Sequence, residues 1–155
     1  MNPETQLGPA ADAGAPAPVR RETGNGETIL VVDDDAGVRE LVNGVLTRRN
    51  FRVLAADSAA AALVLWAEHR ATIQLVLTDI VMPGGVSGSA LAAELLRDRP
   101  DLPVLFMSGY ARDGGERELV RRLGMPMLQK PFTIEQLVRT VRAQLAGAGQ
   151  APPVR

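Results

Sequence analysis

The middle of the chain alternates between two kinds of hydrophobic pattern. Short runs of consecutive apolar residues are typical of strands that are buried on both faces of a parallel sheet. Between these runs, apolar residues recur every three or four positions, which is the spacing of a helix with one buried face. The runs predicted to be strands are 28–32, 51–55, 73–77, 104–107 and 125–129.

A helix is predicted after each of these strands. Ser58 can cap the second helix, and residues 133–136 form a capping box at the start of the last one. Gly124 is expected to end the fourth helix, 116–123, because glycine readily takes the left-handed conformation that follows many helices. The side chains expected to point inward are Val38, Leu41, Val42, Val45 and Leu46 in the first helix, Leu91 and Leu95 in the third (87–97), and Ile134, Leu137, Val138, Val141 and Leu145 in the last.

Regular alternation of strand and helix predicts an α/β fold, because neighbouring parallel strands need helical crossovers on the faces of the sheet. The expected architecture is a flavodoxin-like (βα)5 doubly wound parallel sheet with strand order 2-1-3-4-5. The predicted domain covers residues 28–146. Residues 1–27 and 147–155 are rich in proline, alanine and glycine, and we expect them to be flexible tails.

Composition excludes several classes of function. The 17 basic and 18 acidic side chains leave a net charge of −1, which gives no general attraction to nucleic acid or to an anionic membrane. The absence of cysteine excludes disulfides and thiol catalysis, and it fits a cytoplasmic protein. His69 is the single histidine, so a histidine-rich metal site is excluded as well. No apolar run approaches the ~20 residues of a membrane span.

Polar side chains stand at the ends of four predicted strands. Asp33 and Asp34 follow the first strand, Asp79 the third, Ser108 the fourth and Lys130 the last. Because the carboxyl ends of parallel strands meet at one edge of the sheet, these groups are expected to lie together. The expected strand order puts Asp34 beside Asp79 at the point where the order reverses, which is where open α/β sheets bind ligands.

Each of these residues also has an ordinary structural interpretation. The acidic run 33–35 can be a cluster at a helix amino terminus, where the helix dipole favours negative charge. Asp79 can begin a turn, since aspartate is common there. Ser108 can be a turn residue, and Lys130 can be a solvated surface lysine. We favour the functional interpretation because every one of these groups stands at its own strand end.

The combination of groups predicts a site for a phosphoryl group. Three neighbouring carboxylates repel one another, and a divalent cation bound through oxygen, such as Mg²⁺, relieves this repulsion. The cation and Lys130 can neutralise phosphoryl oxygens, and Ser108 can donate a hydrogen bond to them. Asp79 can then be the nucleophile.

The chain from residue 27 to 146 resembles the receiver domain of two-component response regulators, and it is most similar to the receiver modules of hybrid sensor histidine kinases. The matching motifs are ILVVDDD (29–35), LTDIVMP (77–83), VLFMSGYA (104–111) and KPF (130–132). The resemblance implies that Asp79 accepts phosphate from a histidine kinase or a histidine phosphotransfer protein. It implies a signalling switch that catalyses only its own phosphorylation and dephosphorylation.

The resemblance also implies roles for the neighbouring residues. The expected Mg²⁺ ligands are Asp33 (mainly through water), Asp34, Asp79 and the backbone carbonyl of Val81, and the expected phosphoryl-binding residues are Ser108, Gly109 and Lys130. The Lys130–Pro131 bond is expected to be cis. The surface expected to respond is the fourth helix and last strand, about 116–129, and together with the last helix it is the expected surface of a homodimer.

One position departs from the family pattern. Receivers usually carry an aromatic switch residue three positions before the lysine, where this chain has Met127. Methionine is flexible enough to repack with Ser108. Val81 and Tyr110 occupy the positions that tune loss of the phosphate, and neither offers a carboxylate or amide to orient water. We therefore expect a long-lived phosphorylated form.

Two other functions compete with a phosphorylated receiver. The first is a receiver-like binding module that works without phosphorylation, against which the intact set of Asp34, Asp79, Ser108 and Lys130 argues. The second is a flavodoxin-like or nucleotide-binding enzyme. That class needs a glycine-rich phosphate loop after the first strand, and the acidic run found there instead would repel phosphate in the absence of a metal.

Overall fold

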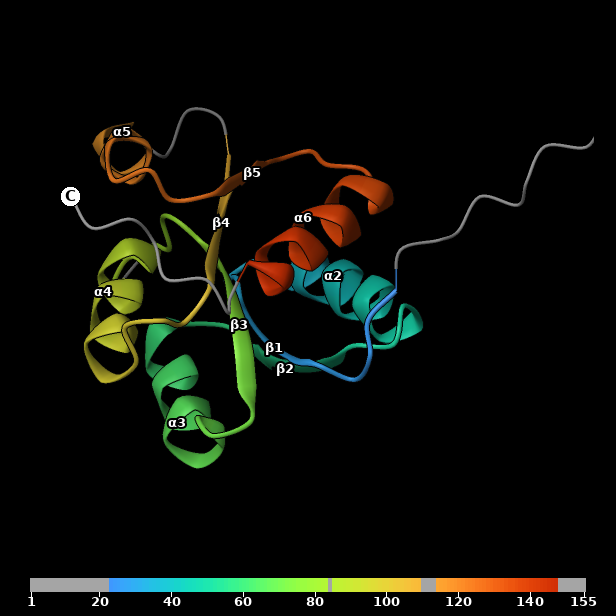
Figure 1. Ribbon diagram of the computed structural model, residues 1–155. Coiled ribbons are helices and arrows are strands. Elements are labelled where there is room, and N and C mark those ends of the chain that lie inside the picture. Colours follow the sequence, from blue (N-terminus) through green and yellow to red (C-terminus); the bar gives the residue numbers. More distant parts are fainter. Residues whose placement is uncertain (1–22, 84, 110–113, 148–155) are drawn as a thin grey trace, which may run out of the picture.

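The computed structural model describes residues 23–83, 85–109 and 114–147, which form one parallel sheet between two layers of helices (Figure 1). The strand order β2-β1-β3-β4-β5 confirms the predicted order. The strands are β1 (Thr28–Val32), β2 (Arg52–Ala56), β3 (Ile73–Asp79), β4 (Val104–Ser108) and β5 (Met127–Gln129).

The helices divide between the two faces of the sheet. One layer contains α2 (Ala36–Arg48) and α6 (Ile134–Ala146), and the opposite layer contains α3 (Ala59–His69), α4 (Gly88–Asp98) and α5 (Gly114–Arg122) (Figure 1).

Alternate residues of the central strands enter two separate hydrophobic cores. In β3, Leu75 and Leu77 pack on the side of α2 and α6, whereas Val76 packs on the side of α3 and α4. Because successive side chains in a strand point to opposite faces, Thr78 faces the α4 layer and Asp79 faces the other layer. The sheet thus presents the two residues at the end of β3 to different neighbours.

Five strand boundaries differ from the prediction by one or two residues, and three of these differences have identifiable reasons. Phe51 precedes β2 because its N–H donates to the carbonyl of Leu46 and so closes α2, after Asn50 has taken a left-handed conformation with φ 68°. β3 continues to Asp79, which pairs with β4. β5 begins only at Met127, because the preceding proline has no N–H to give to the ladder.

The helical predictions were correct for most of the inward-facing side chains and wrong for two. Leu41 is 56% exposed because it lies at the edge of the helix face formed by the buried Val42, Val45 and Leu46, and Ile134 is 49% exposed because it is the first residue of α6. The capping box of α6 is present. α5 begins two residues earlier than predicted, and Gly124 follows it with φ 71°, the conformation expected after a helix end.

The described residues before β1 are bound to the turn between α2 and β2. The N–H of Gly24 donates to the carbonyl of Arg49 at 2.6 Å, and the N–H of Gly26 donates to that of Asn50 at 2.8 Å. Gly24 lies against the ring of Phe51 so closely that a Cβ would be 2.5 Å from it. This short segment, assigned to the tail from the sequence, is therefore held at the amino edge of the sheet.

A polar cluster joins α3 to α4 at the same amino edge. The indole Nε1 of Trp66 donates to Oδ2 of Asp98 at 2.8 Å, and Arg70 donates to the same carboxylate at 3.1 Å. The hydrogen bond from Trp66 contributes most, and together with that from Arg70 it holds the pKa of Asp98 below its ordinary value. The guanidinium of Arg99 lies 5.2 Å from the centre of the Trp66 ring. Trp66 is buried.

Candidate functional site

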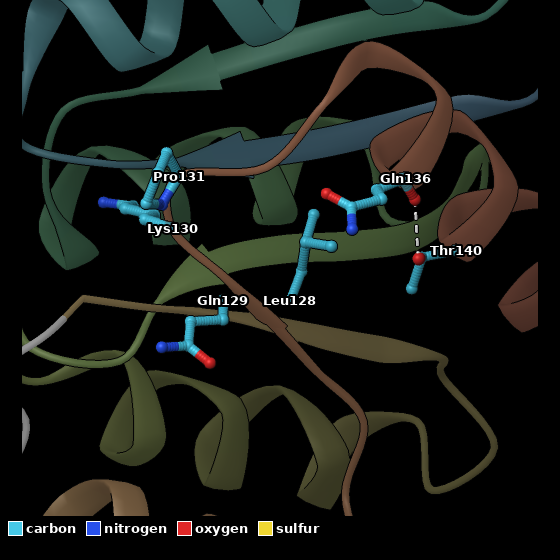
Figure 2. Close-up of a pocket in the computed structure, with 6 residues that line it drawn as sticks. All are labelled: Leu128, Gln129, Lys130, Pro131, Gln136 and Thr140. Carbon is cyan, nitrogen blue, oxygen red and sulfur yellow. Dashed lines mark hydrogen bonds between the residues drawn. The ribbon is translucent and has the colours of Figure 1, made fainter.

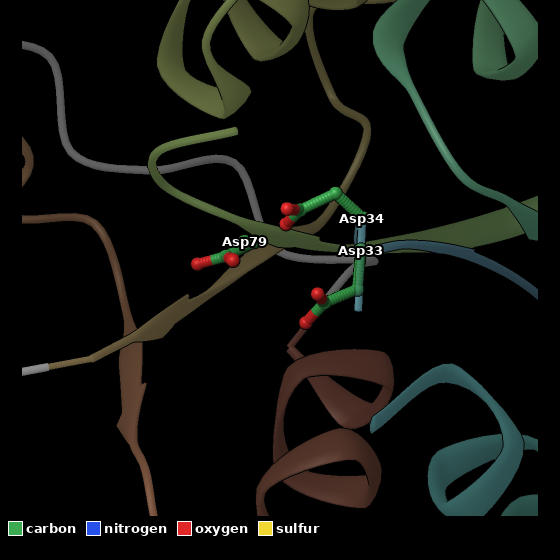
Figure 3. A group of neighbouring side chains, drawn as sticks. All are labelled: Asp33, Asp34 and Asp79. Carbon is green, nitrogen blue, oxygen red and sulfur yellow. The ribbon is translucent and has the colours of Figure 1, made fainter. Parts of the chain in front are cut away.

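The strand register brings the two acidic strand ends together. Val32 of β1 is level with Thr78 of β3, so Asp33 and Asp79 follow paired residues on adjacent strands. One carboxylate oxygen from each of Asp33, Asp34 and Asp79 lies within 4.8 Å of the others. Figure 3 shows the three carboxyl groups directed the same way from the strand ends. The predicted meeting of these residues is confirmed.

The acidic cluster has the composition of a site for a hard divalent cation. Asp33 is fully buried, Asp79 is 8% exposed and Asp34 is exposed, so the cluster opens to solvent on one side. All three residues offer carboxylate oxygens, which are the ligands that Mg²⁺ prefers. The described residues therefore fit the predicted cation in donor type and in closeness.

Asp35 is the residue of the acidic run that caps a helix, so the structural interpretation of the run applies to Asp35 alone. Its Oδ1 accepts hydrogen bonds from the N–H groups of Gly37 at 2.8 Å and Val38 at 3.2 Å, as the N-cap of α2. The helix end is thus capped by one aspartate of the run. Asp33 and Asp34 are left for the cluster with Asp79.

Lys130 places an ammonium group between two of the carboxylates. Its Nζ lies 2.9 Å from Oδ2 of Asp33 and 3.3 Å from Oδ2 of Asp79. The other oxygen of Asp33 accepts a hydrogen bond from the N–H of Asp35 at 2.9 Å. Both oxygens of the buried Asp33 are therefore hydrogen-bonded, as a buried carboxylate requires.

The charge of Lys130 is stable at neutral pH. Burial alone would lower the pKa of its ammonium group, but the hydrogen bond to Asp33 and the charges of Asp33 and Asp79 outweigh burial and raise the pKa above its ordinary value. Because the pKa is higher in the folded state, these contacts contribute fully below the unfolded lysine value of about 10.4. Their contribution is lost only as the pH rises through the folded value.

The end of β4 brings a hydroxyl group to the same edge. Ser108 is 1% exposed and is level with Gln129, the residue before Lys130. The N–H of Lys130 donates to the carbonyl of Ser108 at 2.8 Å, which fixes the two residues together. The Ser108 hydroxyl donates to the carbonyl of Gly109 over a long 3.4 Å, so a stronger acceptor could readily take this donor. The Lys130–Pro131 bond is cis, as the resemblance implied.

The remaining predicted residues lie around this group. Val81 is half-buried in the turn that follows β3, two residues after Asp79. Met127 is half-buried, is level with Phe106 of β4 and packs against the core under α3 and α4. Tyr110 lies outside the described residues, so its predicted role stays a prediction.

Two further residues, which were not predicted from the sequence, hold the main chain of Asp79. The hydroxyl of the buried Thr78 donates to the Asp79 carbonyl at 3.0 Å. Gly88, the first residue of α4, lies against the same carbonyl, and its N–H donates to the carbonyl of Ile80 at 2.7 Å. A Cβ at position 88 would lie 1.7 Å from the Asp79 carbonyl oxygen, so only glycine fits there. The glycine directly after a capping serine was the available signal.

A shallow pocket of about 390 Å³ lies beside the site, between β5 and the start of α6. It is lined by Leu128, Gln129, Lys130, Pro131, Gln136 and Thr140. In Figure 2 the amine of Lys130 points away from Gln136 and Thr140. The polar atoms of those two residues bond within or at the start of α6, since the Thr140 hydroxyl donates to the Gln136 carbonyl and the Gln136 side chain accepts from the N–H of Thr133. The pocket is therefore adjacent to the acidic cluster and separate from it.

Within the described ranges, no helix is both long enough and apolar enough to span a membrane.

Known proteins share this sequence pattern. Residues 29–142 match the response regulator receiver domain family. Sensor kinase CckA of Brucella abortus (strain 2308) is 36% identical over 118 residues, which are 76% of this chain and 12% of the relative. The DNA-binding transcriptional regulator NtrC of Rhizobium meliloti (strain 1021) is 34% identical over 128 residues, which are 82% of this chain and 26% of the relative. This chain thus spans a small part of each relative.

Two solved receiver domains share the fold over almost their whole length. The receiver domain of NtrX from Brucella abortus has a TM-score of 0.69 at 31% identity, with 76% of this chain and 98% of that chain covered. The receiver domain from the hybrid histidine kinase CckA has a TM-score of 0.63 at 30% identity, with the same coverage of 76% and 98%. With the matched family and the strand order, these likenesses show that the chain belongs to the response regulator receiver domain family.

Proposed function

We propose that this receiver domain is the phosphoacceptor of a two-component or phosphorelay system and that Asp79 takes the phosphoryl group. The observation that supports this most strongly is the meeting of three carboxylates and the Lys130 ammonium at one sheet edge. A phosphoryl group carries negative charge, so a nucleophilic carboxylate can approach it only where positive charge is provided.

The transfer follows from the groups around Asp79. One carboxylate oxygen of Asp79 attacks the phosphorus of a phosphohistidine on the donor. The new O–P bond forms as the N–P bond breaks, and the imidazole nitrogen keeps the electron pair. The Lys130 ammonium, the Ser108 hydroxyl and the N–H of Gly109 then donate to the phosphoryl oxygens, which disperses their charge.

Asp33, Asp34, Asp79 and the backbone carbonyl of Val81 would hold Mg²⁺. When bound, the cation supplies positive charge that offsets the charge of the transferred group. Asp33 would act mainly through water, because both of its oxygens already accept hydrogen bonds from protein groups. The exposed Asp34 is the ligand most open to a hydrated ion.

Replacing Asp34 by alanine is expected to weaken Mg²⁺ binding by about tenfold or more, because the most accessible of three carboxylates is lost. Calorimetric titration with Mg²⁺ measures the affinity. Asp57→Ala is the matched control, since Asp57 is also an exposed aspartate after a strand but lies outside the acidic cluster. Equal affinity of Asp34→Ala and the control would refute this metal site.

The proposed partner is a histidine kinase or a histidine phosphotransfer protein, which supplies the phosphoryl group. Phosphorylation would shift α5 and β5, and self-association would use α5, β5 and α6. The exposed Leu119 of α5 and the exposed Leu123 just after it support a docking role for this surface. The nearly neutral charge supports the absence of nucleic-acid and membrane contacts, and the lack of cysteine supports a cytoplasmic location.

Val81 and Tyr110 would make the phosphorylated form long-lived, because neither side chain can orient an attacking water. The double variant Val81→Asn, Tyr110→Glu is expected to lose phosphate about tenfold faster, which corresponds to ~1.4 kcal/mol off the barrier. The decay of the phosphorylated protein at fixed Mg²⁺ after removal of the donor is the measurement. Unchanged or slower decay in the double variant would contradict the proposal.

A further inference from the structure

We infer that the amino-terminal end of α4 couples Asp79 to α5 through a hydrogen bond between Ser89 and Glu116, a route that does not pass through Ser108 or Met127. The inference rests on the proposed function of Asp79 as the phosphoacceptor. It has three structural steps: contact of α4 with Asp79, contact of α4 with α5, and the weak attachment of α5.

The first step is the contact between Gly88 and the main chain of Asp79. Gly88 lies against the Asp79 carbonyl with no room for a Cβ, and its N–H donates to the carbonyl of Ile80. The hydroxyl of Thr78 donates to that same Asp79 carbonyl. Because closely packed groups transmit a displacement, movement of the Asp79 backbone must move the first turn of α4.

The second step is the contact between the first turns of α4 and α5. Ser89 follows Gly88 directly, and its hydroxyl donates to Oε2 of Glu116 in the first turn of α5. The Ser89 oxygen also lies 3.0 Å from that of Ser87, the N-cap of α4. The carboxylate of Glu116 thus reaches the helix end that touches the phosphoacceptor strand.

The third step is the weak attachment of α5 to the rest of the domain. Among its described side chains only Val120 is fully buried. Leu119 in the helix and Leu123 just after it are both exposed. Within the described part of the chain, Nε of Arg117 is buried and has no hydrogen-bond partner. A buried donor without a partner disfavours the present position. One polar contact can therefore influence where α5 lies.

These steps give α5 a second link to the site in a receiver whose switch position is Met127. Methionine adapts its shape to its surroundings and so transmits a displacement less directly than a rigid ring would. The Ser89–Glu116 hydrogen bond would hold α5 in the resting position. Displacement of the Asp79 main chain on phosphorylation would disturb this hydrogen bond and release the helix.

Hydrogen exchange of the amides in 116–122 tests the resting state. Ser89→Ala and Glu116→Ala are each expected to raise the exchange rate by about threefold to tenfold, as loss of one partly exposed hydrogen bond predicts. Glu118→Ala is the matched control, because it removes an exposed glutamate from the same helix. The double variant Ser89→Ala, Glu116→Ala should exchange no faster than the faster single variant, since each change removes the same hydrogen bond.

The same measurement with Mg²⁺ and beryllium fluoride, a phosphoryl mimic, tests the coupling. The wild type is expected to show faster exchange in α5 when the mimic binds, and each of the two single variants should show less than half of that change. Variants that behave as Glu118→Ala does, or additive effects in the double variant, overturn the inference. A wild type that takes no phosphoryl group from acetyl phosphate overturns the proposed function together with the inference, so the two failures are distinguishable.

Discussion

Replacement of Asp79 by asparagine is expected to abolish phosphoryl uptake while the fold is kept. The amide has nearly the volume of the carboxylate but offers no anionic oxygen to attack phosphorus. Lys130 keeps its contact with Asp33 at 2.9 Å, so the strand ends remain joined. After incubation with acetyl phosphate and Mg²⁺, mass measurement should show one added phosphoryl group on the wild type and none on the variant.

Asp57→Asn is the matched control for this experiment. It makes the same chemical change at an exposed aspartate after β2, outside the acidic cluster, and it should gain one phosphoryl group as the wild type does. Thermal unfolding of both variants should confirm that they are folded. Uptake of one phosphoryl group by Asp79→Asn would show that another residue is the acceptor.

Replacement of Lys130 by methionine is expected to slow phosphoryl uptake by about 10²-fold, because a preorganised positive group near the developing charge is lost. Methionine keeps much of the length and the apolar stem of lysine. The initial rate with acetyl phosphate at saturating Mg²⁺ measures the effect. Lys130→Arg keeps the charge and should retain more activity than Lys130→Met.

Lys130→Met should strengthen Mg²⁺ binding, although it slows phosphoryl uptake. The ammonium contacts two of the three carboxylates, so it competes with the metal ion for negative charge. Without it, we expect tighter Mg²⁺ binding and a metal-free protein that is less stable by about 1–3 kcal/mol, because a buried carboxylate has lost its partner. Slower uptake with unchanged Mg²⁺ affinity would show that Lys130 does not compete with the ion.

Much of the fold could be predicted from the sequence because this sheet is buried on both faces. Continuous apolar runs such as that of β3 have few alternatives, and polar residues at the ends of those runs are then conspicuous. The meeting of Asp33, Asp34 and Asp79 followed from the strand order alone. Lys130 at the end of β5 could be assigned to the same edge for that reason.

The parts that could not be predicted depend on how separate elements pack. The approach of Gly88 to the Asp79 carbonyl and the Ser89–Glu116 hydrogen bond both require the exact position of α4. The exposure of Leu41 and Ile134 likewise depends on where each helix meets the sheet. The spacing of apolar residues identifies the buried face of a helix, but it does not show how wide or how long that face is. The length of β5 depends on Pro126, which has no N–H to give to the ladder.

The position of Trp66 makes the protein its own optical probe. It is the single tryptophan of the chain, and it is held by Asp98 and Arg99 at the amino edge, opposite the strand ends that carry the acidic cluster. Its fluorescence should therefore report unfolding of the α3–α4 layer with no background from other indoles. A change in its emission when Mg²⁺ binds would mean that a structural change at the carboxyl ends of the strands had been transmitted to the amino edge of the sheet.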